Sequence, residues 1–223
     1  MGEEANIVSN SEIREDVAAQ ALRGQIRLRT LTTLRWLAVG GQLAAILLTH
    51  VWLGFPLPLG LCLAAIATSA WLNIFVSLRF SPQRVLEDRE AAAHIAFDIV
   101  QLCALLFLTG GVQNPFAVLI LAPVTIAASA LPLRLAIGIG ALALIGVSLL
   151  ARYHFALPWR VGETLQFPGL LKFGFWVALS FAVAFFAAYA HQIAAEAADM
   201  RSAYAASQLV LAREERLAAI GGL

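Results

Sequence analysis

Two groups of polar residues interrupt a mainly apolar chain, and both could do chemistry. The first is "GGVQNPF", residues 110–116, where glycines, a glutamine, an asparagine and a proline separate two long apolar runs. The second is His94, Asp98 and Gln101, whose spacings of four and three residues place them on one face of a helix. The first group could hold a ligand, and the second could carry charge in an apolar environment.

The segment "GGVQNPF" can be interpreted as a turn between two helices. Gly110 and Gly111 can adopt the left-handed conformation that ends a helix. Asn114 is a favoured N-cap residue, and Pro115 suits the first turn of the next helix. This interpretation needs no ligand.

The same residues also suit a ligand site. Two glycines leave the backbone open to close approach, and the first-turn amides of the next helix could donate to a carbonyl oxygen. Asn114 offers an amide donor and Phe116 an aromatic face. A flat apolar head group with carbonyls at opposite edges, such as a quinone, fits this description.

The group of His94, Asp98 and Gln101 also has two interpretations. Asp98 lies about 10 Å along the helix from Ala91, and an ionisable group at depth in a membrane is a functional candidate. Alternatively, His94 and Asp98 lie at the cytoplasmic interface and pair with Arg79 or Arg84. In both cases we expect them near the inner end of the helix, away from a ligand bound at the outer surface.

The composition indicates a membrane protein. Of 223 residues, 61% are hydrophobic and 13% are charged, against about 25% charged in soluble domains. A net charge of +1 provides no basic surface for nucleic acid. Cys62 and Cys103 lie in apolar runs and are expected to be buried thiols, and no closely spaced set of side chains suggests a metal site.

The hydropathy pattern predicts an all-α membrane protein with three regions. These are a cytoplasmic tail (1–30), a six-helix transmembrane domain (31–192) and a cytoplasmic linker helix (193–223). Because a membrane helix needs about 20 mainly apolar residues, six segments qualify: 34–55, 58–78, 91–109, 115–131, 134–151 and 169–190.

The distribution of Lys and Arg predicts the orientation. With the N-terminus inside, the outer side holds three basic residues: Arg152, Arg160 and Lys172. The inner side holds twelve: Arg14, Arg23, Arg27, Arg29, Arg35, Arg79, Arg84, Arg89, Arg134, Arg201, Arg213 and Arg216. Both termini should therefore be cytoplasmic and the segment 110–116 outside. The outer link 152–168 carries several aromatic residues and is expected to lie along the interface.

The alanine-rich region 193–223 is predicted to be a dimerisation helix. Met200, Tyr204 and Leu211 contribute to a narrow apolar seam at the seven-residue spacing of a coiled coil. The alternative is a solvated helix without a partner.

The sequence resembles the RegB/PrrB family of redox-sensing histidine kinases. "GGVQNPF" matches the family's G-G-x-x-N-P-F heptapeptide at every fixed position, with Gly110, Gly111, Asn114, Pro115 and Phe116. The C-terminal "REERLAAIGGL" is similar to the segment that leads into the phosphoacceptor helix of that family. The resemblance implies that these five residues take part in sensing ubiquinone as a regulatory ligand.

The resemblance also implies the surroundings of the sensor. We expect a homodimer in the bacterial inner membrane, in contact with lipid and quinone, whose kinase core follows Leu223. That core would hold the phosphoacceptor histidine, bind ATP and Mg²⁺, and pass phosphate to a cytoplasmic response regulator. Oxidised ubiquinone is expected to favour the less active state.

Two other functions fit the same topology. A small transporter or channel would use His94 and Asp98 along its path, although the glycine–proline break lies at the surface and no internal repeat is evident. A membrane scaffold would leave the heptapeptide without a role.

The charge distribution leads to a test of topology. A reporter fused after Ala156 should behave as periplasmic, and one fused after Arg84 as cytoplasmic, because basic residues are retained on the inner side. Alkaline phosphatase and green fluorescent protein fusions would measure this. The reverse pattern would contradict the orientation.

Overall fold

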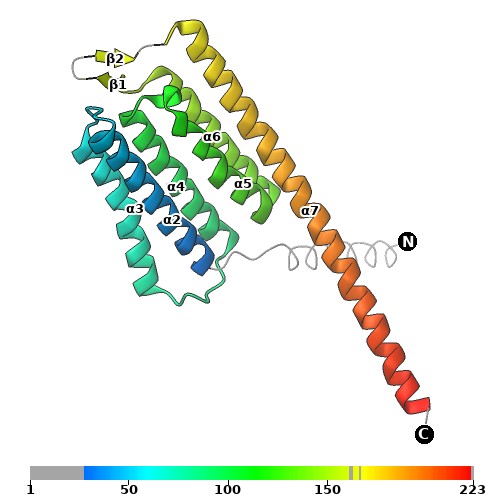
Figure 1. Cartoon of the computed structure of the whole chain (residues 1–223). Coiled ribbons are helices and arrows are strands. Elements are labelled where there is room, and N and C mark those ends of the chain that lie inside the picture. Colours follow the sequence, from blue (N-terminus) through cyan, green and yellow to red (C-terminus); the bar gives the residue numbers. More distant parts are fainter. Residues whose placement is uncertain (1–27, 161–162, 166, 222–223) are drawn as a thin grey trace, which may run out of the picture.

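A computed structural model describes residues 28–160, 163–165 and 167–221, and within them the chain is almost entirely helical (Figure 1). Its elements are, in order, α2 (Leu28–Leu47), the π-helical turn η1 (Leu48–Trp52), α3 (Leu59–Arg79), α4 (Asp88–Leu108), the 3₁₀ turns η2 (Gly111–Gln113) and η3 (Pro115–Ile120), α5 (Leu121–Ala130), α6 (Leu133–Arg152), strands β1 (Leu157–Arg160) and β2 (Glu163–Leu165), and α7 (Gly169–Gly221). The predicted tail 1–30 falls mostly outside the described residues.

Five of the described helices are long and apolar enough to cross a membrane, where the sequence predicted six. They are Leu28–Trp52, Leu59–Arg79, Asp88–Leu108, Leu133–Arg152 and Gly169–Gln208. The predicted fourth span, 115–131, is the shorter apolar helix Pro115–Ala130. Its first six residues are 3₁₀-helical, and at roughly 2.0 Å per residue they extend it to about 27 Å, close to the apolar thickness of a bilayer.

The helices pack around α4, which is shared by two groups. On one side α2 packs on α3 and α3 on α4; on the other, α4 packs on α6, and α5, α6 and α7 pack together. Ile95, Ile99 and Ile120 are among the largest fully buried side chains of the second group. Cys62 and Ile66 are buried in the first. The central position of α4 makes its polar residues the natural meeting point of both groups.

The first helix begins six residues earlier than predicted. Residue 34 was the expected start, but α2 starts at Leu28, whose backbone N–H donates to the carbonyl of Arg84 at 3.0 Å. The polar segment before residue 34 is helical because it is tied to the link between α3 and α4. As a result, Arg35 lies about two turns inside the first membrane-length helix and not in its first turn.

The outer link 152–168 contains a short antiparallel hairpin that the sequence did not predict. In β1 and β2, Leu157 pairs with Leu165 and Pro158 with Thr164. After α6, the backbone N–H of Phe155 donates to the carbonyl of Phe107 in α4 at 2.8 Å. The all-α prediction is therefore correct except at this hairpin, which covers the end of α4.

Helix α7 joins the sixth predicted span and the predicted linker helix in one element of 53 residues. Its first part packs on α5 and α6, and its second part continues well beyond the bundle (Figure 1). No break in the helix marks the predicted boundary between 192 and 193. The part that packs on the bundle and the part beyond it therefore form one continuous helix.

The exposed second part of α7 suggests a test of the dimer. Met200 and Tyr204 are exposed, while the side chain of Leu211 lies outside the described part of the chain. If two copies pair along the predicted seam, single cysteines placed through 197–218 should cross-link with a seven-residue period in membranes. Uniform cross-linking, or none, would contradict a parallel pair.

Candidate functional site

The heptapeptide forms the tight turn that its composition indicates. Gly110 and Gly111 have φ angles of 110° and 61°, the left-handed region that favours glycine. The Asn114 side chain accepts the backbone N–H of Phe116 at 2.9 Å, and Pro115 occupies the first position of η3. The predicted N-cap is confirmed.

The two glycines are also required by close packing against protein. A Cβ added to Gly110 would lie 2.7 Å from Leu157 Cδ1, and one added to Gly111 would lie 2.6 Å from the carbonyl oxygen of Leu150. The His154 ring is equally close to Gly111. The sequence interpretation reserved this space for a ligand head group, but the structure fills it with the hairpin and the end of α6.

The amide of Asn114 is already engaged within the turn. Its nitrogen donates to the Thr109 carbonyl at 3.0 Å and to Thr109 Oγ1 at 2.7 Å. Thr109 in turn donates to the carbonyl of Leu105 at 2.8 Å. Since an amide nitrogen has two hydrogens, both donors of Asn114 are used. Its expected donation to a ligand would have to replace one of these bonds.

Gln113, which occupies a variable position of the motif, is a residue whose role the sequence analysis missed. It is buried, its amide nitrogen lies 2.7 Å from His154 Nε2, and its oxygen accepts the Phe167 N–H at 3.3 Å. The other ring nitrogen of His154 lies 2.8 Å from the Leu150 carbonyl, so that Nδ1 donates and Nε2 accepts. The signal that could have found it was a glutamine two residues after a pair of glycines in an apolar chain.

Asp98 pairs with Arg35, a partner the sequence analysis did not consider. Arg35 Nε donates to Asp98 Oδ1 at 2.7 Å, and Nη2 donates to Oδ2 at 3.2 Å and to the His94 carbonyl at 3.3 Å. The Arg35 side chain is 2% exposed and that of Asp98 is 29% exposed. The alternative in which Asp98 pairs with Arg79 or Arg84 is therefore wrong, and Arg84 pairs with Glu90 at 2.7 Å instead.

Gln101 forms a second polar connection between α2 and α4. Its amide nitrogen donates to Gln42 Oε1 at 3.1 Å and to the Ala65 carbonyl at 3.3 Å, while Gln42 donates back to Gln101 Oε1 at 3.3 Å. Gln42 was also missed by the sequence analysis. Its signal was a lone amide in the apolar run of the first helix.

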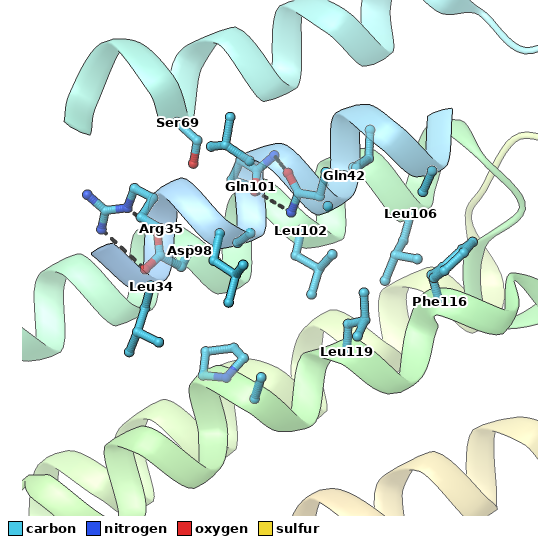
Figure 2. Close-up of a pocket in the computed structure, with 18 of the residues that line it drawn as sticks. Leu34, Arg35, Gln42, Ser69, Asp98, Gln101, Leu102, Leu106, Phe116 and Leu119 are labelled. Carbon is cyan, nitrogen blue, oxygen red and sulfur yellow. Dashed lines mark hydrogen bonds and ion pairs between the residues drawn. The ribbon is translucent and has the colours of Figure 1, made fainter. Parts of the chain in front are cut away.

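These polar pairs line a cavity of about 500 Å³ between α2, α4, η3 and α5, which we call the central cavity. Figure 2 shows the ion pair and the amide pair on one side, with Phe116 and Leu119 on the opposite side. The walls are otherwise mainly apolar. Asn114 and Phe116 of the heptapeptide contribute to the same wall as Leu119.

The central cavity overturns the expectation that Asp98 and Gln101 are remote from the heptapeptide. Asp98 lies midway along α4, and it lines the cavity together with Gln101, Asn114 and Phe116. His94 belongs elsewhere, in a second cavity of about 340 Å³ with Arg84 and Glu90. Spacing along α4 alone could not show this, because the cavity is closed by η3 and α5 on its other side.

No group of three or more His, Cys, Asp or Glu side chains within the described ranges could hold a metal ion. The chemistry of the central cavity is that of hydrogen bonding and apolar contact. It suits a lipid-soluble molecule with few polar atoms.

A family model described as the PilS-like transmembrane domain matches residues 37–200. The chain belongs to this family. With five helices of membrane length among the described residues, it is a multi-pass membrane protein. The matched region includes Asp98, Gln101 and the heptapeptide, and it begins two residues after Arg35.

The resemblance to the RegB family is confirmed. Two proteins named sensor histidine kinase RegB, both from Cereibacter sphaeroides, are 43% identical over 197 residues and 44% identical over 198. These matches cover 88% and 89% of this chain but only 43% of each relative. The chain thus spans less than half the length of these curated relatives, as a RegB-family transmembrane sensor region. No solved structure matches it.

The ion pair leads to a stability test. Asp98→Asn should cost about 3–5 kcal/mol of unfolding free energy, because it leaves the Arg35 charge buried without a counter-charge. The double variant Arg35→Gln with Asp98→Asn should recover part of that loss. Unfolding of the detergent-solubilised protein, followed by circular dichroism, would measure both.

The matched control for this test is Glu90→Gln. It breaks the pair with Arg84, whose two side chains are 35% and 37% exposed, and should change stability by no more than about 1 kcal/mol, because water screens a pair that it reaches. Equal effects of Asp98→Asn and Glu90→Gln would show that the Arg35–Asp98 pair is not buried in the folded protein.

Proposed function

We propose that this domain is the membrane sensor of a redox-responsive two-component histidine kinase and that it binds ubiquinone in the central cavity. The observation that carries the proposal is the cavity itself. Its wall includes Asn114 and Phe116 of the heptapeptide, and its opposite side holds the paired side chains of α2 and α4.

The size and lining of the cavity suit a quinone head group. A volume of about 500 Å³ lies within the range of roughly 300–1,000 Å³ that small-molecule sites occupy. Leu34, Leu37 and Leu119 line the cavity and are also exposed on the surface of the helices. A ligand that is dissolved in the bilayer can therefore enter sideways between α2 and α5.

The heptapeptide contributes by shaping one wall. Its two glycines fit against Leu157 and His154, which places Pro115 at the start of η3 and turns Phe116 towards the cavity. Phe116 remains 46% exposed, so its ring can contact a ligand. The turn and the ligand site are thus two roles of one segment.

Helix α5 connects the cavity to the signalling helix. Ala122, Pro123 and Ile126 of α5 line the cavity, and α5 packs along α7. His191 Nδ1 of α7 lies 3.1 Å from the Ala128 carbonyl of α5. A ligand that shifts α5 would therefore displace α7, and a coupling energy of about 1–3 kcal/mol is sufficient for a switch.

In the whole protein we expect this movement to control a kinase. The curated relatives are sensor histidine kinases by name, which favours a homodimer whose kinase core binds ATP and Mg²⁺ and phosphorylates a response regulator. We expect oxidised ubiquinone to favour the less active state. A transporter is disfavoured because Asp98, its proposed path residue, is neutralised by Arg35.

The wall formed by Phe116 can be tested by titration. A short-tailed ubiquinone should bind the purified domain saturably, and Phe116→Ala should weaken it by about 1 kcal/mol, or roughly fivefold, through lost ring contact. Phe181→Ala is the matched control, because Phe181 is 74% exposed on α7 and does not line the cavity.

Asn114→Ser would not separate an effect on ligand binding from an effect on the turn. It keeps an oxygen that can cap η3, but it removes both donations to Thr109 and should loosen the turn. Equal quinone affinities in wild type, Phe116→Ala and Phe181→Ala would contradict a site at the heptapeptide wall. Absence of saturable binding to wild type would remove the quinone proposal altogether.

A further inference from the structure

The hydrogen-bond donors around the central cavity are not equally available to a ligand. Both hydrogens of the Asn114 amide go to Thr109, and the Thr109 hydroxyl goes to Leu105. The heptapeptide side of the cavity therefore has no unused hydrogen on Asn114 or Thr109. The polar groups of the opposite wall are the amide pair and Arg35, which donates through Nε and Nη2 to Asp98 and to the His94 carbonyl. We therefore look for the polar contact of a ligand on that wall.

The amide pair on that wall has a determined orientation. The Ala65 carbonyl can only accept, so the Gln101 atom 3.3 Å from it must be the nitrogen. Gln101 then donates its second hydrogen to Gln42 Oε1 at 3.1 Å and accepts from Gln42 Nε2 at 3.3 Å. The backbone of α3 thus orients Gln101, and Gln101 orients Gln42.

This chain of bonds leaves one hydrogen of Gln42 available. Gln42 Nε2 carries two hydrogens, and within the part of the chain that the structure describes only one of them has an acceptor, Gln101 Oε1. Gln42 lines the cavity and is half-buried. An N–H in an apolar wall with no acceptor costs free energy, and a ligand carbonyl would recover it.

We infer that the Gln42 amide, oriented by Gln101, donates to a carbonyl oxygen of the quinone, so that the head group lies between α2 and α5 and not in the heptapeptide turn. The inference rests on the proposed function, because it assigns the polar contact of that same ligand. Gln101 is a positioning residue, and Phe116 supplies the apolar wall across the cavity.

The depth of the amide pair agrees with this placement. Gln101 lies eight residues before Thr109 in α4, which at 1.5 Å per residue puts it about 12 Å below the turn. A head group at that depth would still reach the wall formed by Phe116 and Leu119, and its tail could leave between the exposed side chains of Leu34 and Leu37.

Infrared spectroscopy of a bound, carbonyl-¹³C-labelled short-tailed ubiquinone tests the assignment. A hydrogen bond from an amide lowers the stretching frequency of the accepting carbonyl, and this shift should appear in the wild-type domain. In Gln42→Met the shift should disappear, and the affinity should fall about fivefold, as expected for one neutral hydrogen bond. Gln192→Met is the matched control, because Gln192 is exposed on α7 and bonds to Glu196.

Two further variants keep the test decisive. Gln42→Met with Gln101→Met removes both amides, so that neither is left without a partner, and should also lose the shift. If Gln42→Met does not fold, Gln42→Asn provides the comparison by withdrawing the amide by one methylene. Ser69→Ala removes the Ser69 hydroxyl, which also lines the cavity, and should leave the shift unchanged.

The outcomes separate this inference from the proposed function. A bound carbonyl with no shift, or one whose shift survives in Gln42→Met or disappears in Ser69→Ala, overturns the assignment to Gln42, while the loss of affinity in Phe116→Ala would still support the site. Saturable binding that a phospholipid abolishes, with no carbonyl shift, would identify the cavity as a lipid groove. No quinone binding to wild type would overturn both proposals.

Discussion

The ion pair between Arg35 and Asp98 is the interaction on which the arrangement of this domain depends. Each charge lies in a helix of membrane length, where a charge without a partner is costly. Neither helix can rotate or slide without separating them. The pair therefore determines how α2 lies against α4, and the hydrogen bonds of Gln42 and Gln101 add a second contact between the same two helices.

The central cavity follows from this constraint together with the turn at the other side. α2 is held against α3 and α4, whereas η3 and α5 are directed by a turn that fits tightly beneath the hairpin and the end of α6. The two sets of contacts leave a space between α2 and α5 that side chains do not fill. α2 packs mainly on α3, whereas α5 packs mainly on α7 and α6.

In the proposed function, helix α7 would carry a movement of α5 out of the membrane. It packs on α5, which lines the cavity, and it continues without interruption to Gly221. Most of its membrane-length segment is exposed, as its apolar aromatic residues Phe181, Phe185 and Tyr189 indicate. A helix held on one face only is easier to displace than one buried on all sides, which suits an element that transmits a signal.

The sequence alone determined the elements whose physical cause is local. The apolar runs predicted the membrane-length helices, because burial of apolar surface in lipid depends on composition and length. The heptapeptide predicted its own turn, since positive φ angles and helix capping depend on the residues concerned. Its match to a known motif also identified the family, which the comparisons confirmed.

What only the tertiary structure decided was which distant groups meet. In the sequence, Arg35 is one of many basic residues near the predicted cytoplasmic tail, and Gln42 is an isolated amide. The role of Arg35 depends on Asp98, 63 residues away, and that of Gln42 on Gln101, 59 residues away. The occupied space beside Gly110 and Gly111 depends on the end of α6 and on the hairpin that follows it, roughly forty to fifty residues later in the chain. Helix periodicity places residues on a face, but the partner opposite that face is set by the packing of all the helices together, and so the polar wall of the cavity could not be derived from the sequence of any one of them.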